Sequence, residues 1–263
     1  MGIPVYHTEK EQTAEQKQEA KDKEGMLAVV SEVQKYFVEQ LEADSPEASR
    51  AREYAFDRWG ENYCRELGIG FASHDWDSLP EYCKAHGLDE HYLKEVELLR
   101  YSDKSNKLYP FFRERITIPI HDRYGKLIAF TARYIGDDPS SPKYINSPTS
   151  PIFKKDEVVF GLHTALRQAS KNGRFIIVEG APDVLTLQSD KVGLTETVAA
   201  LGTSWSEKQF AQLQRYAPTL VFIPDSDPPK EGQLFPPGID AVMRNGLTAL
   251  KMGFNVSVRE IPS

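Results

Sequence analysis

Residues 174–180 read Arg-Phe-Ile-Ile-Val-Glu-Gly, and this stretch decides the fold. The four apolar residues at 175–178 are rich in β-branched side chains and predict a short strand. Glu179 closes the strand with a carboxylate, and Gly180 permits a sharp turn and a close approach of the backbone. We therefore expect a strand that ends in a polar turn.

The residues that follow repeat this alternation of strand and helix. We expect helices at residues 183–189, 206–216 and 238–252, and strands at residues 197–201, 220–223 and 255–261. Strands that alternate with helices of this length predict a parallel, Rossmann-like α/β sheet. Ligands of such sheets bind beyond the carboxyl ends of the strands, so those ends are the candidate site.

The first part of the chain has a different pattern. Apolar residues recur at three- and four-residue spacing from Leu27 to Leu41, which predicts an amphipathic helix. Further helical patterns cover residues 49–59, 61–67, 76–86 and 89–100. Two alternating segments flank a Tyr-Gly turn and predict a β-hairpin, and a loop rich in proline and serine follows, at residues 116–120, 127–133 and 136–151 respectively.

The predicted organisation therefore has three parts. Residues 1–25 form a flexible charged leader, either disordered or a frayed helix, because they are dominated by Glu, Lys, Gln and Ala. Residues 26–170 form a helical and β-hairpin N-terminal subdomain, and residues 171–263 form the parallel sheet. The fold class is α+β in the first part and α/β in the second.

Composition excludes several classes of protein. The 263 residues are 40% hydrophobic and 27% charged, which is ordinary for a soluble globular protein and excludes a mostly disordered one. No apolar run approaches the ~20 residues that a membrane span needs, and no signal peptide is present. We expect a cytoplasmic monomer. The net charge of −7 argues against a protein that binds nucleic acid through bulk charge.

Carboxylates cluster at the predicted strand ends. Asp225 and Asp227 close the third strand of the sheet, Glu179 closes the first, and Asp183 lies one short turn beyond it. Carboxylates at close range repel one another unless a cation lies among them, and such oxygen ligands suit Mg²⁺ or Mn²⁺. The alternative is that these residues cap helices, since acidic residues are common at helix N-termini and the Asp-x-Asp spacing alone is weak.

A basic segment lies upstream of these carboxylates. Residues 101–155 contain ten lysines and arginines and five acidic residues, a net charge of +5 in an acidic chain. Arg113 and Arg115 are two residues apart and are expected to share a face of the hairpin. A basic surface beside an acidic metal site is what phosphodiester chemistry requires. The alternative for several of these lysines is an ordinary solvated surface.

A zinc site is the competing interpretation for another group of residues. Cys64, Cys83, His86 and His91 include one plausible ligand spacing, Cys-x-x-His. The four share no finger pattern, however, so we favour buried cysteines and surface histidines.

The strand-end motifs resemble a TOPRIM domain. Glu179-Gly180, Leu201-Gly202-Thr203 and Asp225-x-Asp227 occur in the order of that metal-binding fold, which bacterial primases, topoisomerases and some nucleases share. The upstream segment is more specific. Residues 112–120, Phe-Arg-Glu-Arg-Ile-Thr-Ile-Pro-Ile, are similar to the FRNRIMFPI strand of DnaG-type bacterial primases, and Lys-Tyr-Ile-Asn-Ser-Pro at 143–148 resembles their KYLNSPET segment.

The resemblance implies the catalytic core of a primase, with a Rossmann-like TOPRIM sheet and Mg²⁺ or Mn²⁺ as cofactor. It implies synthesis of short RNA primers from ribonucleoside triphosphates on single-stranded DNA, with a replicative helicase as a partner through a flanking domain. Carried over by position, Glu179, Asp225 and Asp227 are catalytic metal ligands with Asp183 beside them. The implied nucleic-acid and nucleotide-binding residues are Arg113, Arg115, Arg133, Lys143, Asn146 and Lys155.

The sequence also departs from the family pattern. The family's Phe-Gly-Gly-Arg segment is Phe130-Thr131-Ala132-Arg133 here, so both glycines are replaced. Ser226 stands between the aspartates where the family has glycine, and Pro228-Pro229 opens an insertion. The zinc ribbon and helicase-binding domain are absent, and the chain stops where a third acidic cluster begins in the family. We therefore expect an excised piece of a longer primase or a reduced relative from a phage or mobile element. Two alternative functions remain: a TOPRIM nuclease or topoisomerase-like domain, with Tyr144 as a conceivable nucleophile, and a non-catalytic nucleic-acid-binding module.

Overall fold

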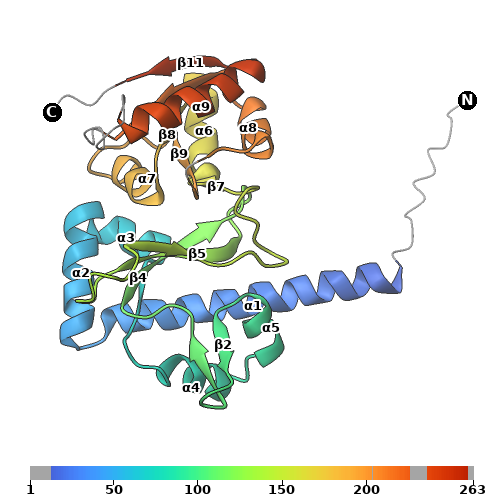
Figure 1. The fold of residues 1–263 in the computed structure, drawn as a ribbon, viewed down its shortest axis with the longest axis vertical. Helices are drawn as coiled ribbons and strands as arrows, with labels where there is room; N and C mark the ends of the chain where they lie inside the picture. Colours follow the sequence, from blue (N-terminus) through green and yellow to red (C-terminus); the bar gives the residue numbers. More distant parts are fainter. Residues whose placement is uncertain (1–12, 203, 226–235, 260–263) are drawn as a thin grey trace, which may run out of the picture.

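The computed structural model describes residues 13–202, 204–225 and 236–259. Figure 1 shows two bodies, one built on an antiparallel sheet and the other on a mostly parallel sheet. The helices and strands of the first body are α1 (Ala14–Glu42), α2 (Pro46–Trp59), α3 (Glu61–Leu67), β1 (Gly70–Ala72), α4 (Ser78–Ala85), α5 (Glu90–Glu95), β2 (Leu99–Ser102), β3 (Lys107–Pro110), β4 (Arg115–His121), β5 (Leu127–Tyr134) and β6 (Tyr144–Asn146).

The second body contains the alternating elements that the sequence predicts. They are β7 (Val159–Phe160), α6 (Leu162–Asn172), β8 (Arg174–Val178), α7 (Ala181–Gln188), β9 (Thr197–Ala200), α8 (Glu207–Gln214), β10 (Thr219–Phe222), α9 (Pro237–Lys251) and β11 (Asn255–Val258). The strand order is β11-β10-β8-β9-β7, with β7 antiparallel to β9 and the other pairs parallel. The prediction of a Rossmann-like sheet is therefore confirmed, with one antiparallel edge strand added.

The N-terminal sheet has the order β1-β4-β5-β6 and is antiparallel throughout. Its centre is the predicted hairpin, β4 with β5, and α1 packs across it. Phe37 of α1 is 1% exposed and meets Phe130 of β5 edge to face, with ring centroids 5.3 Å apart. A Cβ on Gly70 of β1 would lie 2.6 Å from the backbone carbonyl carbon of Phe37, so the glycine is what lets helix and strand approach. The aromatic contact and the glycine together fix α1 on the sheet.

The two bodies share a hydrophobic core. Side chains of β8 alternate, so that Phe175 and Ile177 lie in the core of the second body. Ile176 and Val178 instead join the core that contains α1 and the antiparallel sheet. Every second residue of this strand therefore packs toward the N-terminal body.

Three sequence-based boundaries were wrong. The leader predicted over residues 1–25 overlaps α1, which begins at Ala14 behind a capping box of Thr13 and Gln16, while residues 1–12 lie outside the described part. Good helix formers continue this helix without apolar contacts, which a search for apolar periodicity misses. The helix predicted over 89–100 ends at Glu95, and the loop predicted over 136–151 contains β6.

Among the described residues, no helix combines the length and the apolar character needed to cross a membrane.

We expect Phe37→Ala to lower the free energy of unfolding by about 3–5 kcal/mol, because it leaves a cavity between α1 and the hairpin. Tyr124→Ala is the control, since Tyr124 is 78% exposed at the hairpin turn. Urea denaturation followed by circular dichroism measures both. Similar losses for the two variants would show that the α1 contact does not hold this body together.

Candidate active site

Three carboxylates meet at the carboxyl edge of the parallel sheet. Glu179 follows β8 and Asp225 follows β10, and these strands are neighbours. The backbone N–H of Asp225 donates a hydrogen bond to Oε1 of Glu179, over 3.0 Å. Asp183 lies in the first turn of α7, which begins directly after Gly180. The structure therefore brings together three of the four predicted acidic residues, and the fourth, Asp227, lies outside the described residues.

The electrostatics of this edge are unfavourable for the ionised form of Asp183. Burial raises the pKa of Asp183, and the negative charges of Asp225 and Glu179 raise it further. Arg58 of α2 acts in the opposite direction, with Nη2 lying 3.9 Å from Oδ1 of Asp183. The net shift is upward, so the arginine offsets only part of the repulsion.

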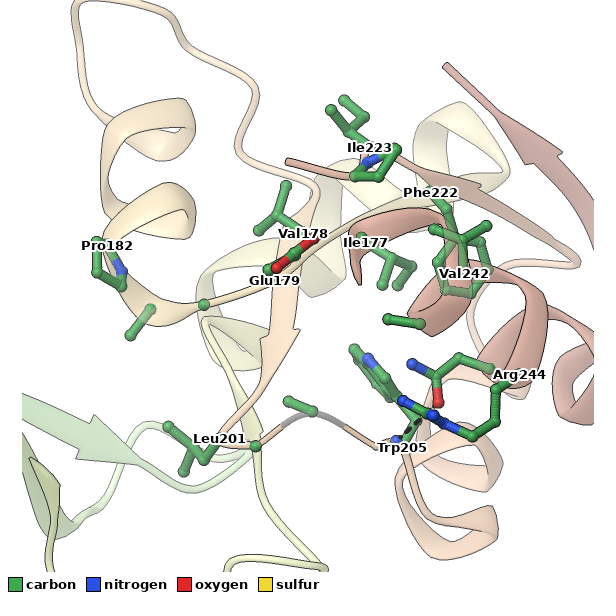
Figure 2. A pocket seen from close by; sticks show the side chains of 18 of the residues that line it. Ile177, Val178, Glu179, Pro182, Leu201, Trp205, Phe222, Ile223, Val242 and Arg244 are labelled. Carbon is green, nitrogen blue, oxygen red and sulfur yellow. Dashed lines mark hydrogen bonds between the residues drawn. The ribbon is translucent and has the colours of Figure 1, made fainter. Parts of the chain in front are cut away.

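Two hollows open on this edge. The smaller, of about 180 Å³, is lined by Arg58, Asp183 and Asp225 among others. The larger is a cleft of about 580 Å³ with Glu179 on one side and Trp205 and Arg244 on the other (Figure 2). Thr131, Tyr144 and Asn146 of the N-terminal sheet also line the larger cleft, so it lies between the two bodies.

The donor set fits a hard divalent cation. Carboxylate oxygens are the ligands that Mg²⁺ and Mn²⁺ prefer, and a cation would relieve the repulsion that raises the pKa of Asp183. Within the described residues, no group of three or more His, Cys, Asp or Glu side chains is placed so that its members alone could hold a metal ion. The edge is instead open, which suits Mg²⁺ because that ion usually keeps several waters.

Two of the predicted basic and amide residues lie at the end of β9. Asn146 Nδ2 donates a hydrogen bond to the carbonyl of Leu201, over 3.0 Å. The side chain of Lys155 passes close to Gly202. A Cβ built on Gly202 would lie 3.3 Å from Nζ of Lys155. These residues bring an amide and a positive charge to the sheet edge that carries the carboxylates.

Arg113 and Arg115 are placed differently from the prediction. The expected shared face assumed an extended chain, but Glu114 between them has a φ of 52° and β4 begins only at Arg115. Arg115 is 6% exposed and donates a hydrogen bond to the carbonyl of Pro142 over 2.9 Å. Arg113 lies over the ring of Trp76 at 3.5 Å, and burial lowers the pKa of both guanidinium groups. Arg113 thus stacks on Trp76 at the surface, and Arg115 supports the loop that contains Pro142.

The remaining predicted residues, Arg133 and Lys143, do not themselves line the larger cleft. Arg133 lies between the rings of Tyr54 and Tyr144, 4.2 and 5.4 Å from their centroids. Its Nη1 donates a hydrogen bond to the Tyr144 hydroxyl, over 3.3 Å. Lys143 is exposed just before β6. Arg133 therefore supports Tyr144, which lines the larger cleft, and Lys143 faces solvent.

The zinc interpretation is wrong. Cys64 and Cys83 are buried free cysteines, and burial raises the pKa of both thiols to about 12. His86 stacks on Tyr82 at 3.9 Å, and His91 is exposed. The preferred interpretation of buried cysteines and surface histidines is the one that the structure supports.

Two residues were missed by the sequence reasoning, one at the acidic edge and one beside Arg113. Arg58 reaches Asp183 from α2, and no local motif marks an arginine that acts across two bodies. Trp76 is 52% exposed, carries the Arg113 stack and meets Tyr109 edge to face at 6.0 Å. A tryptophan in a polar segment near basic residues was the available signal.

Two family models match this chain. The model described as DNA primase catalytic core, N-terminal domain, matches residues 36–166, and the model described as Toprim-like matches residues 176–263. Together they include the elements on both sides of the cleft.

Curated relatives and solved structures agree with these models. The chain is 39% identical over 163 residues to a DNA primase of Pseudomonas putida, which is 62% of this chain and 24% of the relative. It is 34% identical over 232 residues to a DNA primase of Clostridium acetobutylicum, which is 88% of this chain and 36% of the relative. The chain therefore spans about a quarter to a third of the length of these relatives.

Among solved structures, a DNA primase domain from Pseudomonas aeruginosa is 31% identical with a TM-score of 0.75, covering 90% of this chain and 71% of that one. A DnaG primase catalytic domain bound to single-stranded DNA is 28% identical with a TM-score of 0.76, covering 93% of this chain and 75% of that one.

We expect Asp183→Asn to raise Tm by roughly 2 °C near pH 7.5 without divalent cations. An aspartate whose pKa is raised by folding is destabilised while ionised, so the gain is present above that pKa and vanishes as the pH falls through it. Thermal unfolding in EDTA at several pH values measures the effect.

Glu207→Gln is the matched control, because Glu207 also lies in the first turn of a helix, α8. Glu207→Gln is expected to leave Tm unchanged. A lower Tm for Asp183→Asn at pH 7.5 would show that the Arg58 contact outweighs the carboxylate repulsion.

Proposed function

The chain belongs to the family of DnaG-type bacterial DNA primases, and on this premise we propose that it joins ribonucleotides into short primers on single-stranded DNA. The observation that carries the proposal is the position of the acidic edge. Glu179 and Asp225 follow neighbouring parallel strands. Asn146 and Gly202 line the same cleft as Glu179, and the side chain of Lys155 lies against Gly202. Acidic and basic groups are thus opposed at one site, as nucleotidyl transfer requires.

We propose that Glu179, Asp183 and Asp225, with Asp227, hold Mg²⁺ or Mn²⁺. When bound, the cation supplies charge stabilisation to the attacking hydroxyl and the pyrophosphate leaving group. The residues of this chain position the reactants. Lys155 holds triphosphate oxygens at the end of β9, and Asn146 fixes the loop after that strand through its bond to Leu201.

We further propose that the Trp76–Arg113 stack binds the template strand. An exposed indole with a guanidinium against it offers an aromatic face for a base and a positive charge for a phosphate. Such a surface holds single strands without reading their sequence, which leaves specificity to base pairing.

Cleavage through a tyrosine intermediate has less support. Burial raises the pKa of Tyr144 to about 12, so its phenolate is scarce at neutral pH. Its hydroxyl also accepts a hydrogen bond from Arg133, as expected of a structural side chain. The Pro228-Pro229 insertion, on which the non-catalytic alternative rests, lies outside the described residues.

Asp225→Asn is expected to abolish Mg²⁺-dependent primer synthesis. The fold should survive, because the hydrogen bond to Glu179 uses the backbone N–H of residue 225. The assay follows radiolabelled ribonucleotides on a single-stranded template, with Asp190→Asn, an exposed residue beyond α7, as the control. Undiminished synthesis by Asp225→Asn would refute the assignment of the acidic edge.

Trp76→Ala is expected to weaken binding of single-stranded DNA about tenfold, since loss of one base stack costs ~1–3 kcal/mol. Tyr101→Ala is the control, because Tyr101 is similarly exposed, at 50%. Fluorescence anisotropy with a labelled oligothymidylate measures both at a fixed salt concentration. Equal affinities for the two variants would exclude a template-binding role for the stack.

A further inference from the structure

A basic side chain from the N-terminal body lies beside the acidic edge. Arg58 is in the last turn of α2, and its Nη2 lies 3.9 Å from Oδ1 of Asp183 in α7. This distance is longer than a hydrogen bond, so the contact is a pairing of charges that leaves Oδ1 able to accept a cation. Arg58 is thus a counter-ion built into the proposed metal site.

The position of Arg58 is fixed by Tyr54, one turn earlier in α2. Nη1 of Arg58 donates a hydrogen bond to the Tyr54 hydroxyl, over 3.2 Å. The ring of Tyr54 is itself held, because the guanidinium of Arg133 lies 4.2 Å from its centroid and Trp59 meets it edge to face at 6.0 Å. The side chain of Arg58 cannot withdraw without losing this hydrogen bond, so its charge stays near Asp183.

Contacts that do not involve Arg58 hold α2 and α3 against the helix that carries Asp183 (Figure 1). The hydroxyl of Tyr63 in α3 donates a buried hydrogen bond to Oε1 of Gln188 in α7, over 3.3 Å. Lys191, just beyond α7, donates hydrogen bonds to two backbone carbonyls of α2. The separation of the two helices is therefore set by the fold, and we expect it to persist when the side chain of Arg58 is replaced.

The guanidinium and two of the carboxylates line one confined space. The hollow of about 180 Å³ is bounded by Arg58, Asp183 and Asp225 and by apolar side chains that include Val178 and Ile223. Apolar walls lower the local dielectric constant and strengthen the interactions between charges in the hollow. A divalent cation held there by the two aspartates is therefore repelled by the guanidinium.

We propose that Arg58 is a positioning residue that acts through Asp183 and limits the affinity of the acidic edge for its divalent cation. In the metal-free chain, the guanidinium is the counter-ion of the carboxylate. When the carboxylate instead holds a divalent cation, the tethered guanidinium repels that cation and weakens its binding. The inference rests on the proposed function, in which Asp183 and Asp225 are ligands of Mg²⁺ or Mn²⁺. The free cation is thereby disfavoured relative to one that arrives on a negatively charged triphosphate.

Isothermal titration calorimetry with Mn²⁺, on the full chain without nucleotide, tests the proposal. Arg58→Gln should bind Mn²⁺ about three- to tenfold more tightly than wild type, because a positive charge is removed from a partly solvent-screened site. Arg58→Met, a second neutral variant, should match it, and Arg58→Lys should bind as wild type does. Arg50→Gln is the matched control and should leave Kd unchanged, since Arg50 is in the same helix, pairs with Asp137 at 4.0 Å and lines neither hollow.

A gain in affinity separates this role from a merely structural one, because damage to the fold weakens metal binding. Unchanged or weaker Mn²⁺ binding by both neutral variants, with circular dichroism spectra like that of wild type, would overturn the proposal and leave the proposed function intact. Absence of Mn²⁺ binding by wild type would instead refute the metal site itself, and with it both proposals. The measurement does not use primer synthesis.

Discussion

The strand Arg174–Val178 is buried on both faces, and the rest of the structure depends on that constraint. It is the central strand of the parallel sheet, and its alternate side chains fill two different cores. A strand without a free face can present polar groups only at its ends. Glu179 is the first residue beyond the buried run, so its carboxylate is forced to the edge where the neighbouring strand delivers Asp225.

The clustering of carboxylates that the proposed function needs lowers the stability of the fold. Acidic groups are gathered where burial and mutual repulsion raise the pKa of Asp183, and one partly exposed arginine offsets only some of that cost. A fold selected for stability alone would separate these charges. The strain is tolerable because the core beneath them is large and continuous, running from α1 through the hairpin to β8.

The sequence was sufficient to predict those helices and strands that carry a local pattern. The alternating strands and helices after residue 174 and the hairpin were predictable because each carries its own periodicity. The short strands β1, β6 and β7 were not, since two or three residues show no period and their pairing is long-range. The same distinction holds at the site. Glu179 and Asp225 are marked by strand ends, whereas Arg58 reaches Asp183 from a helix more than a hundred residues earlier.

One of those short strands explains how basic residues reach the acidic edge. β7 is antiparallel to β9, with Val159 opposite Ala200, so the chain enters β7 at the carboxyl end of β9. The segment before it must therefore pass over that edge, which is where Lys155 crosses Gly202 and Asn146 bonds to Leu201. A parallel strand in this position would begin at the opposite edge and carry the same residues away from the carboxylates. This antiparallel strand is thus what allows a mostly parallel sheet to gather both signs of charge on one side.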